Sequence, residues 1–147
     1  MVPDSASSPS LPTRMTEIVV CTTCRSPHTA REMPADGLQL LEAVEAAALM
    51  ADSGLAAGSA IRVRGQACMS GRSRGCVVAF QATGKHTYLI GDLRASAETA
   101  ADVVHCARLH LSHSDGSMAW GDRPERLRRG ILAKVPPVAT MVEGAPV

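Results

Sequence analysis

The stretch EIVVCTTC, residues 17–24, joins a strand-forming run to a pair of cysteines. The β-branched run from Glu17 to Val20 is typical of a strand, and it ends directly at Cys21. Pro27 and Pro34 exclude a continuous helix over the residues that follow, so the cysteine pair is predicted to lie on a loop. The sequence therefore predicts a strand that carries two thiols at its carboxyl end.

Periodic patterns downstream of this loop predict the next elements. Apolar residues recur at helical spacing from Gly37 to Asp52, and Gly54 ends the pattern. Residues 61–64 alternate between apolar and charged, as in a strand with one solvated face. The runs 77–81 and 86–90 flank a short connection with a glycine and predict a β-hairpin. The predicted apolar stripe of the helix consists of Leu38, Leu41, Val44, Ala48 and Ala51.

A second helix is predicted from a cap at Ser96 to an end near Ser114, Asp115 and Gly116, with an apolar stripe of Ala97, Ala100, Val104, Ala107 and Leu111. A last short helix, opened by Pro124, is predicted between Arg123 and Leu132. A strand, a crossover helix and a strand imply a parallel pair, and the hairpin adds antiparallel strands. We therefore expect an α/β fold of the thioredoxin-like type, with a small mixed sheet of about four strands (β-α-β-β-α) and helices packed on it.

The composition limits the partners. The chain has 147 residues, 46% hydrophobic and 20% charged, which suits one domain of ordinary size. Its formal charge of +1 is too balanced for binding driven by a phosphate backbone, and one Phe, one Tyr and one Trp cannot form a base-stacking platform. No stretch approaches the roughly 20 apolar residues that cross a bilayer. We expect neither nucleic acid nor a membrane as a partner.

The predicted folded domain spans residues 15–137. Residues 1–14 are rich in Ser and Pro, lack the pattern of a secretory signal and are expected to form a disordered leader. Residues 138–147 are expected to form a disordered tail. Five cysteines, an odd number, do not suggest a secreted disulfide framework, so we expect a cytoplasmic protein with thiol or metal chemistry.

Four of the cysteines are candidate ligands. Cys21 and Cys24 enclose two threonines, and Cys68 and Cys76 flank a loop of Gly, Ser and Arg. Because the carboxyl ends of neighbouring parallel strands lie side by side, the two cysteine loops can meet. Four thiolates suit an iron–sulfur cluster or structural zinc. The alternative is that these cysteines are small buried hydrophobic residues.

The fifth cysteine and the histidines are expected to have structural roles or to be solvated rather than to bind a metal. Cys106 lies within the second predicted helix and is expected to pack in the core. His110 and His113 are one helical turn apart and could hold a metal, but at the end of a helix they are expected to be solvated. His28 is the histidine near the first cysteine loop.

Arginines accompany the cysteine loops and the C-terminal region. Those near the cysteines either offset the charge of bound thiolates or form a solvated basic face. Those near the C-terminus either dock an acidic partner or are solvated. The first set is Arg25, Arg62, Arg64, Arg72 and Arg74, and the second is Arg123, Arg126, Arg128 and Arg129.

Several of these stretches occur together in one family. They are VCTTCR at 20–25, CMSG at 68–71, GC at 75–76, YLIGDL at 88–93, and the stretch from Trp120 to Pro136. With them, residues 17–137 resemble an uncharacterised bacterial family, a domain of unknown function labelled as a predicted metal-binding protein. That family is similar to thioredoxin-like two-iron, two-sulfur ferredoxins, and its members are often encoded near cobalamin-biosynthesis genes.

The resemblance implies that a [2Fe–2S] cluster is bound by Cys21, Cys24, Cys68 and Cys76 and carries single electrons to a redox partner protein. A homodimer is one of the oligomeric states that the sequence leaves open. Zinc or another divalent metal on the same cysteines is the alternative, and a thiol–disulfide oxidoreductase the third. The family's second loop generally has a further cysteine where this chain has Arg72, so Arg72→Cys is expected to raise cluster occupancy. Motifs of hydrolases and transferases are lacking, which favours a non-enzymatic role.

Overall fold

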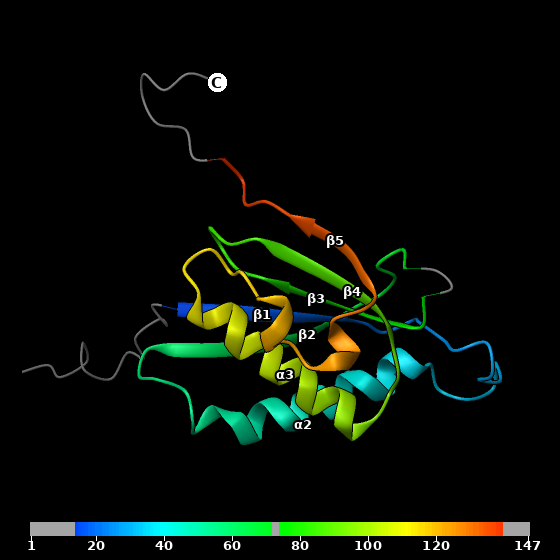
Figure 1. The fold of residues 1–147 in the computed structure, drawn as a ribbon. Helices are drawn as coiled ribbons and strands as arrows, with labels where there is room; N and C mark the ends of the chain where they lie inside the picture. Colours follow the sequence, from blue (N-terminus) through cyan, green and yellow to red (C-terminus); the bar gives the residue numbers. More distant parts are fainter. Residues whose placement is uncertain (1–13, 72–73, 140–147) are drawn as a thin grey trace, which may run out of the picture.

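The structure is a computed structural model, and it describes residues 14–71 and 74–139. Within these residues the strands form one five-stranded sheet in the order β2-β1-β3-β4-β5, and α2 and α3 lie on the same face of it (Figure 1). The elements are β1 (Arg14–Cys21), α2 (Asp36–Asp52), β2 (Ser59–Gln66), β3 (Cys76–Gln81), β4 (Thr87–Leu93), α3 (Ala97–Ser112), the 3-10 helices η1 (Trp120–Asp122) and η2 (Glu125–Leu127), and β5 (Ile131–Val135).

The predicted mixed sheet is confirmed. β1 pairs directly with β2 in parallel, and α2 is the crossover connection between the two strands. β3 and β4 form the antiparallel hairpin. β3 also lies antiparallel to β1, so the buried run of the opening stretch forms an interior strand between β2 and β3. The first four strands therefore have the predicted thioredoxin-like arrangement, and the strand count is five rather than about four.

The prediction of a last short helix between Arg123 and Leu132 was wrong. Pro124 opens only the 3-10 turn η2, and the chain then forms the edge strand β5 against β4. Gly130 makes this change possible because it has a φ of +76°, and a side chain there would lie 2.5 Å from the carbonyl oxygen of Gly91. The amide of Gly91 donates to the carbonyl of Gly130 at 2.8 Å, which fixes the approach.

On α2 the most buried residues differ from the predicted stripe, whereas the start of α3 is as predicted. On α2 the buried residues are Gly37, Leu40 and Val44, whereas the predicted Leu38 is 43% exposed. Gly37 sets this rotation, since a Cβ atom there would lie 1.9 Å from the carbonyl oxygen of Cys21 and only glycine lets the helix approach so closely. On α3 the predicted cap is confirmed: the Ser96 hydroxyl accepts a hydrogen bond from an amide of the first turn.

The end of the sheet where β1 begins is closed by a buried histidine. His110 is fully buried, so the expectation that it is solvated was wrong. Its Nδ1 lies 3.0 Å from the Thr16 hydroxyl, and its Nε2 lies 2.7 Å from the carbonyl oxygen of His86. Gly116 packs against the ring, because a Cβ there would lie 2.6 Å from Nε2. Burial lowers the pKa of His110, so the neutral ring is the form that the fold holds.

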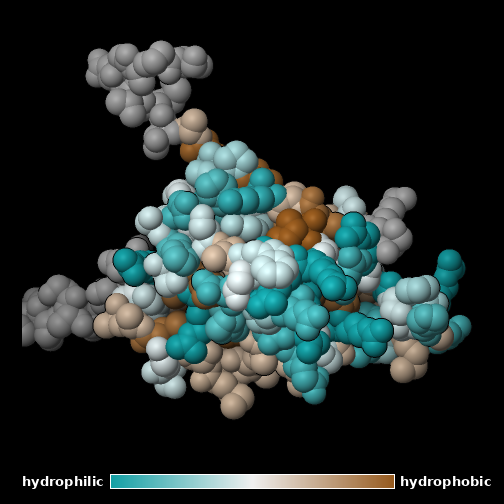
Figure 2. All heavy atoms as spheres, in the orientation of Figure 1, coloured by the Kyte–Doolittle hydropathy of each residue, from teal (hydrophilic) through white to brown (hydrophobic). Residues whose placement is uncertain are grey.

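The surface and the chain ends complete the description. The face that carries α3 is mainly hydrophilic, and its hydrophobic side chains form small separate groups (Figure 2). No helix among residues 14–71 and 74–139 combines the length and apolar character needed to span a bilayer. Arg14, placed in the predicted leader, is the first residue of β1. Residues 1–13, Arg72 and residues 140–147, with the predictions made for them, lie outside the described residues.

Candidate thiol site

Both cysteine loops lie at the same end of the sheet. Cys21 is the last residue of β1, and it is paired with Gln66, the last residue of the parallel strand β2. Cys68 follows Gln66 by two positions, and Cys76 is the first residue of β3. Parallel pairing thus brings the loops together from distant parts of the chain, as the topology predicted.

A cavity of about 200 Å³ lies between the two loops. Three of the four candidate cysteines line it: Cys21, Cys24 and Cys68. Cys76 is not among the lining residues, and it is 1% exposed and packed in the hydrophobic core. The remaining lining residues are Thr23, Arg25, Met69, Ser70, Gly71 and Gly75.

Hydrogen bonds connect the loops around this cavity. The amide of Cys68 donates to the hydroxyl oxygen of Thr23 at 3.0 Å, and that oxygen lies 3.7 Å from the sulfur of Cys21. Cys68 and Ser70 have φ angles of 57° and 60°, in the left-handed region that residues other than glycine seldom adopt. Such strain persists where the surroundings impose it, and it is often found at functional loops.

The thiols lining the cavity are in different electrostatic environments. Burial alone would raise the pKa of Cys21, but hydrogen bonds from Cys24, from the amide and hydroxyl of Thr23, and from the amide of Met69 outweigh it and lower that pKa. Burial, the hydrogen bond with Cys21 and repulsion from neighbouring thiols raise the pKa of Cys24 to about 12. Of these two sulfurs, Cys21 is therefore the better prepared to carry negative charge.

Cys76 and Cys106 differ in their neighbours although both are buried. Burial, with repulsion from Asp36 and Cys21, raises the pKa of Cys76 to about 12, so this thiol is electrostatically coupled to the site. Burial also raises the pKa of Cys106 to about 12, but the charges near it are Arg123 and an aspartate of α3. Cys106 packs in the core of the protein, which confirms the prediction for it.

The first cysteine loop leads directly onto the N-terminus of α2. The amide of Gly37 donates to the carbonyl of Cys24 at 3.0 Å, although the residues between them form a long loop. Arg25 holds that loop by donating to the carbonyl oxygens of Ala30, at 3.0 Å, and Met33, at 2.6 Å. The loop is long in sequence, but the hydrogen bond from Gly37 brings Cys24 to the N-terminus of α2.

Most of the arginines near the cysteines are engaged within the protein. Arg64 pairs with Glu17 at 3.0 Å, and Arg74 forms two bonds to the carboxylate of Asp92 at 2.9 and 2.6 Å. These ion pairs neutralise part of the positive charge that was expected around the thiols. Arg25 lines the cavity itself.

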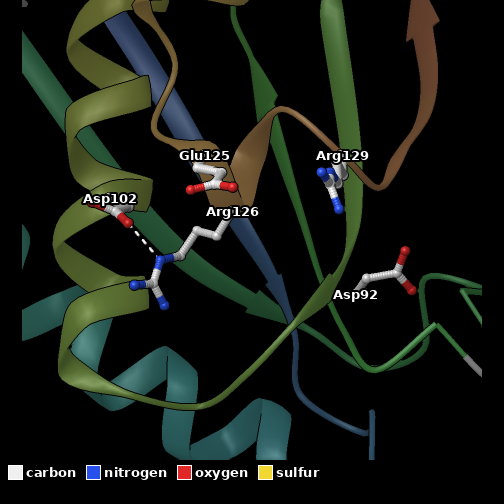
Figure 3. A pocket seen from close by; sticks show the side chains of 5 residues that line it. All are labelled: Asp92, Asp102, Glu125, Arg126 and Arg129. Carbon is white, nitrogen blue, oxygen red and sulfur yellow. Dashed lines mark ion pairs between the residues drawn. The ribbon is translucent and has the colours of Figure 1, made fainter.

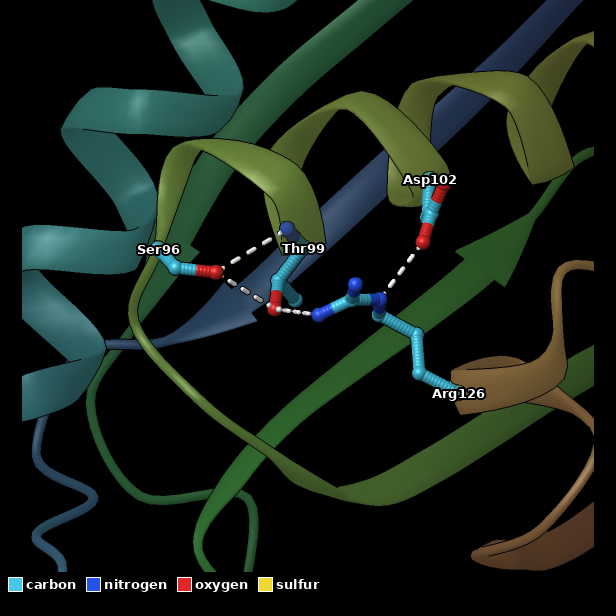
Figure 4. A network of polar contacts seen from close by, with 4 residues as sticks. All are labelled: Ser96, Thr99, Asp102 and Arg126. Carbon is cyan, nitrogen blue, oxygen red and sulfur yellow. Dashed lines mark hydrogen bonds and ion pairs between the residues drawn. The ribbon is translucent and has the colours of Figure 1, made fainter.

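A second hollow, of about 540 Å³, lies between β4, α3 and η2 (Figure 3). Its described lining carries three carboxylates and two guanidinium groups, so it has no strong preference for either charge. Arg126 reaches across to α3, where Nε lies 2.6 Å from Asp102 and Nη1 donates to the Thr99 hydroxyl at 3.2 Å (Figure 4). These contacts join η2 to α3.

Two of the four predicted docking arginines of the C-terminal region, Arg126 and Arg128, form contacts within the protein. Arg128 lies 4.7 Å from the centre of the Trp120 ring and donates to the carbonyl of Arg123 at 2.8 Å. Arg123 is 7% exposed, and its buried Nε and Nη1 have no hydrogen-bond partner among the described residues. Arg126 and Arg128 therefore stabilise the segment after α3. Whether any of them contacts a partner stays a prediction.

The donor set has the chemistry of a soft-metal or iron–sulfur site, since thiolates are the preferred ligands of both. Among residues 14–71 and 74–139, no group of three or more His, Cys, Asp or Glu side chains is arranged to hold a single metal ion. The thiols that line the cavity, with the amide donors around them, nevertheless fit a thiolate-bound group by their chemical type.

The sequence did not indicate every group at this site. Thr23 was visible between the two cysteines, but its bond to the amide of Cys68 depends on a loop 45 positions away. The backbone amides that face the sulfurs, such as that of Met69 toward Cys21, have no signal in the sequence at all.

The fold and the site define a small thioredoxin-like α/β protein with a thiol cavity at one end of its sheet. The chain belongs to the family described as "Protein of unknown function (DUF1636)", whose model matches residues 18–137, so the predicted membership of a family of unknown function is confirmed. A solved structure, "Structure of a thioredoxin-like [2Fe-2S] ferredoxin from Aquifex aeolicus", is 19% identical, with a TM-score of 0.48 over 87% of this chain and 100% of that chain. That likeness assigns no cofactor to this chain. No curated protein matches the sequence.

Proposed function

We propose that Cys21, Cys24, Cys68 and Cys76 bind a [2Fe–2S] cluster and that the protein carries single electrons. The observation that carries this proposal is the cavity to which three of these thiols contribute from two distant segments of the chain. Cys76 does not line the cavity, but it is near enough to Cys21 for that thiol to contribute, after burial and Asp36, to raising the pKa of Cys76. Its own thiol must lose a proton to become a ligand.

The residues around the sulfurs have separate roles in this proposal. The Met69 amide and Thr23 stabilise negative charge on Cys21, which a bound thiolate requires. The amide of Val77 does the same for Cys24. A [2Fe–2S] cluster would supply a centre that accepts and releases one electron. We further propose that this electron transfer serves cobalamin metabolism, as the family resemblance of the sequence implies.

The thiols differ in exposure, which indicates the side from which a redox partner would approach the site. Cys68 is exposed and Cys24 is half-buried, whereas Cys21 is 1% exposed. A redox partner would therefore approach the side of Cys68, where the path to the bound centre is shortest. The loop residues Met69 and Ser70 lie on this side of the cavity.

Analysis of protein purified without oxygen tests the proposal. We expect about two irons and two sulfides per chain, a visible charge-transfer spectrum and an electron paramagnetic resonance signal after one-electron reduction. Cys68→Ala should abolish all three. Cys106→Ala, which also removes one sulfur, should leave them unchanged. A colourless protein with stoichiometric zinc would instead establish the same thiols as a zinc site.

Thiol–disulfide exchange is a second candidate because the pKa of Cys21 is lowered while that of Cys24 is raised. The burial of Cys21 opposes it, since an attacking sulfur must reach its substrate. Turnover of a small disulfide, lost in Cys24→Ser, would favour this function over the first.

A further inference from the structure

The two cysteine loops are joined at a single side-chain hydroxyl. The amide of Cys68 donates to the oxygen of Thr23 at 3.0 Å, and the same oxygen lies 3.7 Å from the sulfur of Cys21. We infer that Thr23 is a positioning residue: its hydroxyl holds the Cys68 loop against the Cys21 loop and sets the reduction potential of the bound centre.

The pairing of β1 with β2 ends just before Cys68, so the Cys68 amide needs an acceptor other than the strand backbone, and the Thr23 hydroxyl provides it. The ladder between β1 and β2 continues to a bond from the amide of Thr22 to the carbonyl of Gln66, at 3.0 Å. Beyond it the second loop turns through the left-handed conformation of Cys68, which regular strand pairing does not accommodate. The Thr23 oxygen takes the place of the next backbone acceptor and receives the Cys68 amide.

The direction of the hydrogen bonds follows from the chemistry of the three groups. A backbone amide can only donate, so Thr23 accepts from Cys68. A ligating Cys21 is a thiolate without a proton, so the remaining contact must be donation from the Thr23 hydroxyl to sulfur. This relay stabilises negative charge at Cys21.

Reduction adds one electron to the bound cluster and therefore adds negative charge. A hydrogen bond to a ligating sulfur stabilises the reduced state more than the oxidised state, and so raises the midpoint potential. Replacing the hydroxyl with a methyl group should lower it. This half of the inference rests on the proposed function, whereas the contact between the loops does not.

Adjacent threonines provide matched variants. Thr23→Val keeps the size of the side chain and removes the hydroxyl, and Thr23→Ser restores the hydroxyl without the methyl group. Thr22→Val is the control, because the Thr22 hydroxyl has no hydrogen-bond partner in residues 14–71 and 74–139 and its methyl group packs near Gly65. Thr23 is exposed, so the loss of its bond should leave the protein folded.

Two readouts separate the inference from the proposed function. In the metal-free protein, Thr23→Val should speed hydrogen exchange at the Cys68 amide several-fold, with Thr23→Ser and Thr22→Val close to wild type. In the iron-loaded protein, Thr23→Val should shift the midpoint potential downward, and Thr23→Ser should restore it.

Each result decides one part. If Thr23→Val matches Thr22→Val in amide exchange, the hydroxyl does not join the loops and the inference is overturned. If exchange accelerates but the potential is unchanged, the effect on potential is overturned. If the wild-type protein holds no iron and sulfide, the proposed function fails, and amide exchange alone decides whether Thr23 joins the loops.

Discussion

The two ends of the sheet use polar and titratable residues in opposite ways. At the end where β1 begins, Thr16 and the carbonyl of His86 satisfy both ring nitrogens of the buried His110. At the end where β1 finishes, thiols with opposed pKa shifts surround a cavity, and Cys68 is exposed. The first arrangement completes the core, whereas the second keeps donor groups accessible. The comparison teaches that His110 is structural, whereas Cys68 at the second end is accessible from solvent.

The largest expected effect is at the histidine end. His110→Ala should lower the free energy of unfolding by about 3 kcal/mol, because it leaves a cavity and removes the partner of the Thr16 hydroxyl. Urea unfolding measures this. His113→Ala, at an exposed position, should change stability by less than about 0.5 kcal/mol. Equal effects of the two substitutions would contradict a structural role for His110.

At the cysteine end, substitution of an exposed cysteine should abolish iron binding with little change in stability. Cys68→Ala should abolish iron binding and change the free energy of unfolding of the metal-free protein by less than about 0.5 kcal/mol, because Cys68 is exposed. Cys106→Ala should keep the iron and cost about 1 kcal/mol through lost core packing. Iron analysis and urea unfolding on the same samples check both. Retention of iron by Cys68→Ala would remove Cys68 from the ligand set.

The buried histidine and the buried thiols should also limit stability on opposite sides of neutral pH. His110 has a lowered pKa, so its contribution is present above pH 6.5 and is lost as the pH falls below that value and the unfolded state takes up a proton. Cys76 and Cys106 have pKa values raised from 9 to about 12, so their contribution is present below pH 9 and is lost as the pH rises toward 12. Cys21, with a lowered pKa, acts in the opposite sense to these two.

Urea unfolding of the reduced, metal-free protein across this range tests the assignment. Cys106→Ala should flatten the alkaline limb and leave the acid limb as it is. An alkaline limb that is unchanged in Cys106→Ala would show that this buried thiol does not contribute to it.

The smallest expected effect lies between the two ends, at the contact of η2 with α3. Arg126→Ala removes the ion pair with Asp102 and the bond to Thr99 (Figure 4). Because both charged side chains are partly exposed, we expect a loss of only about 0.5 kcal/mol, smaller still at high salt, and no change in bound iron. A loss of iron in this variant would connect the second hollow to the thiol site.

Sequence patterns predicted the parts of the molecule that depend on local periodicity and chain direction. The strand before Cys21 and the parallel pair were predictable, and they place the Cys68 loop beside the first cysteines. His110 falls on the buried stripe of α3, so the helical period could have revealed its burial, although the polar side chain argued otherwise.

Other features depend on tertiary contacts and could not be predicted from local sequence patterns. β5 is a strand because it pairs with β4 after the left-handed turn at Gly130, whereas Pro124 alone favoured a helix. The rotation of α2 follows from the close approach of Gly37 to Cys21. The role of Thr23 depends on an amide from the other loop. Each of these needs the position of a distant backbone.

Cysteine alkylation under native conditions tests most directly whether the two loops bind one centre. In the metal-free protein we expect Cys68 to react first and Cys106 to stay protected, as their exposure requires. Reconstitution with iron and sulfide should protect Cys68 and Cys24 together and in proportion to the iron bound, as read by mass spectrometry. Continued rapid alkylation of Cys68 in fully loaded protein would contradict the account.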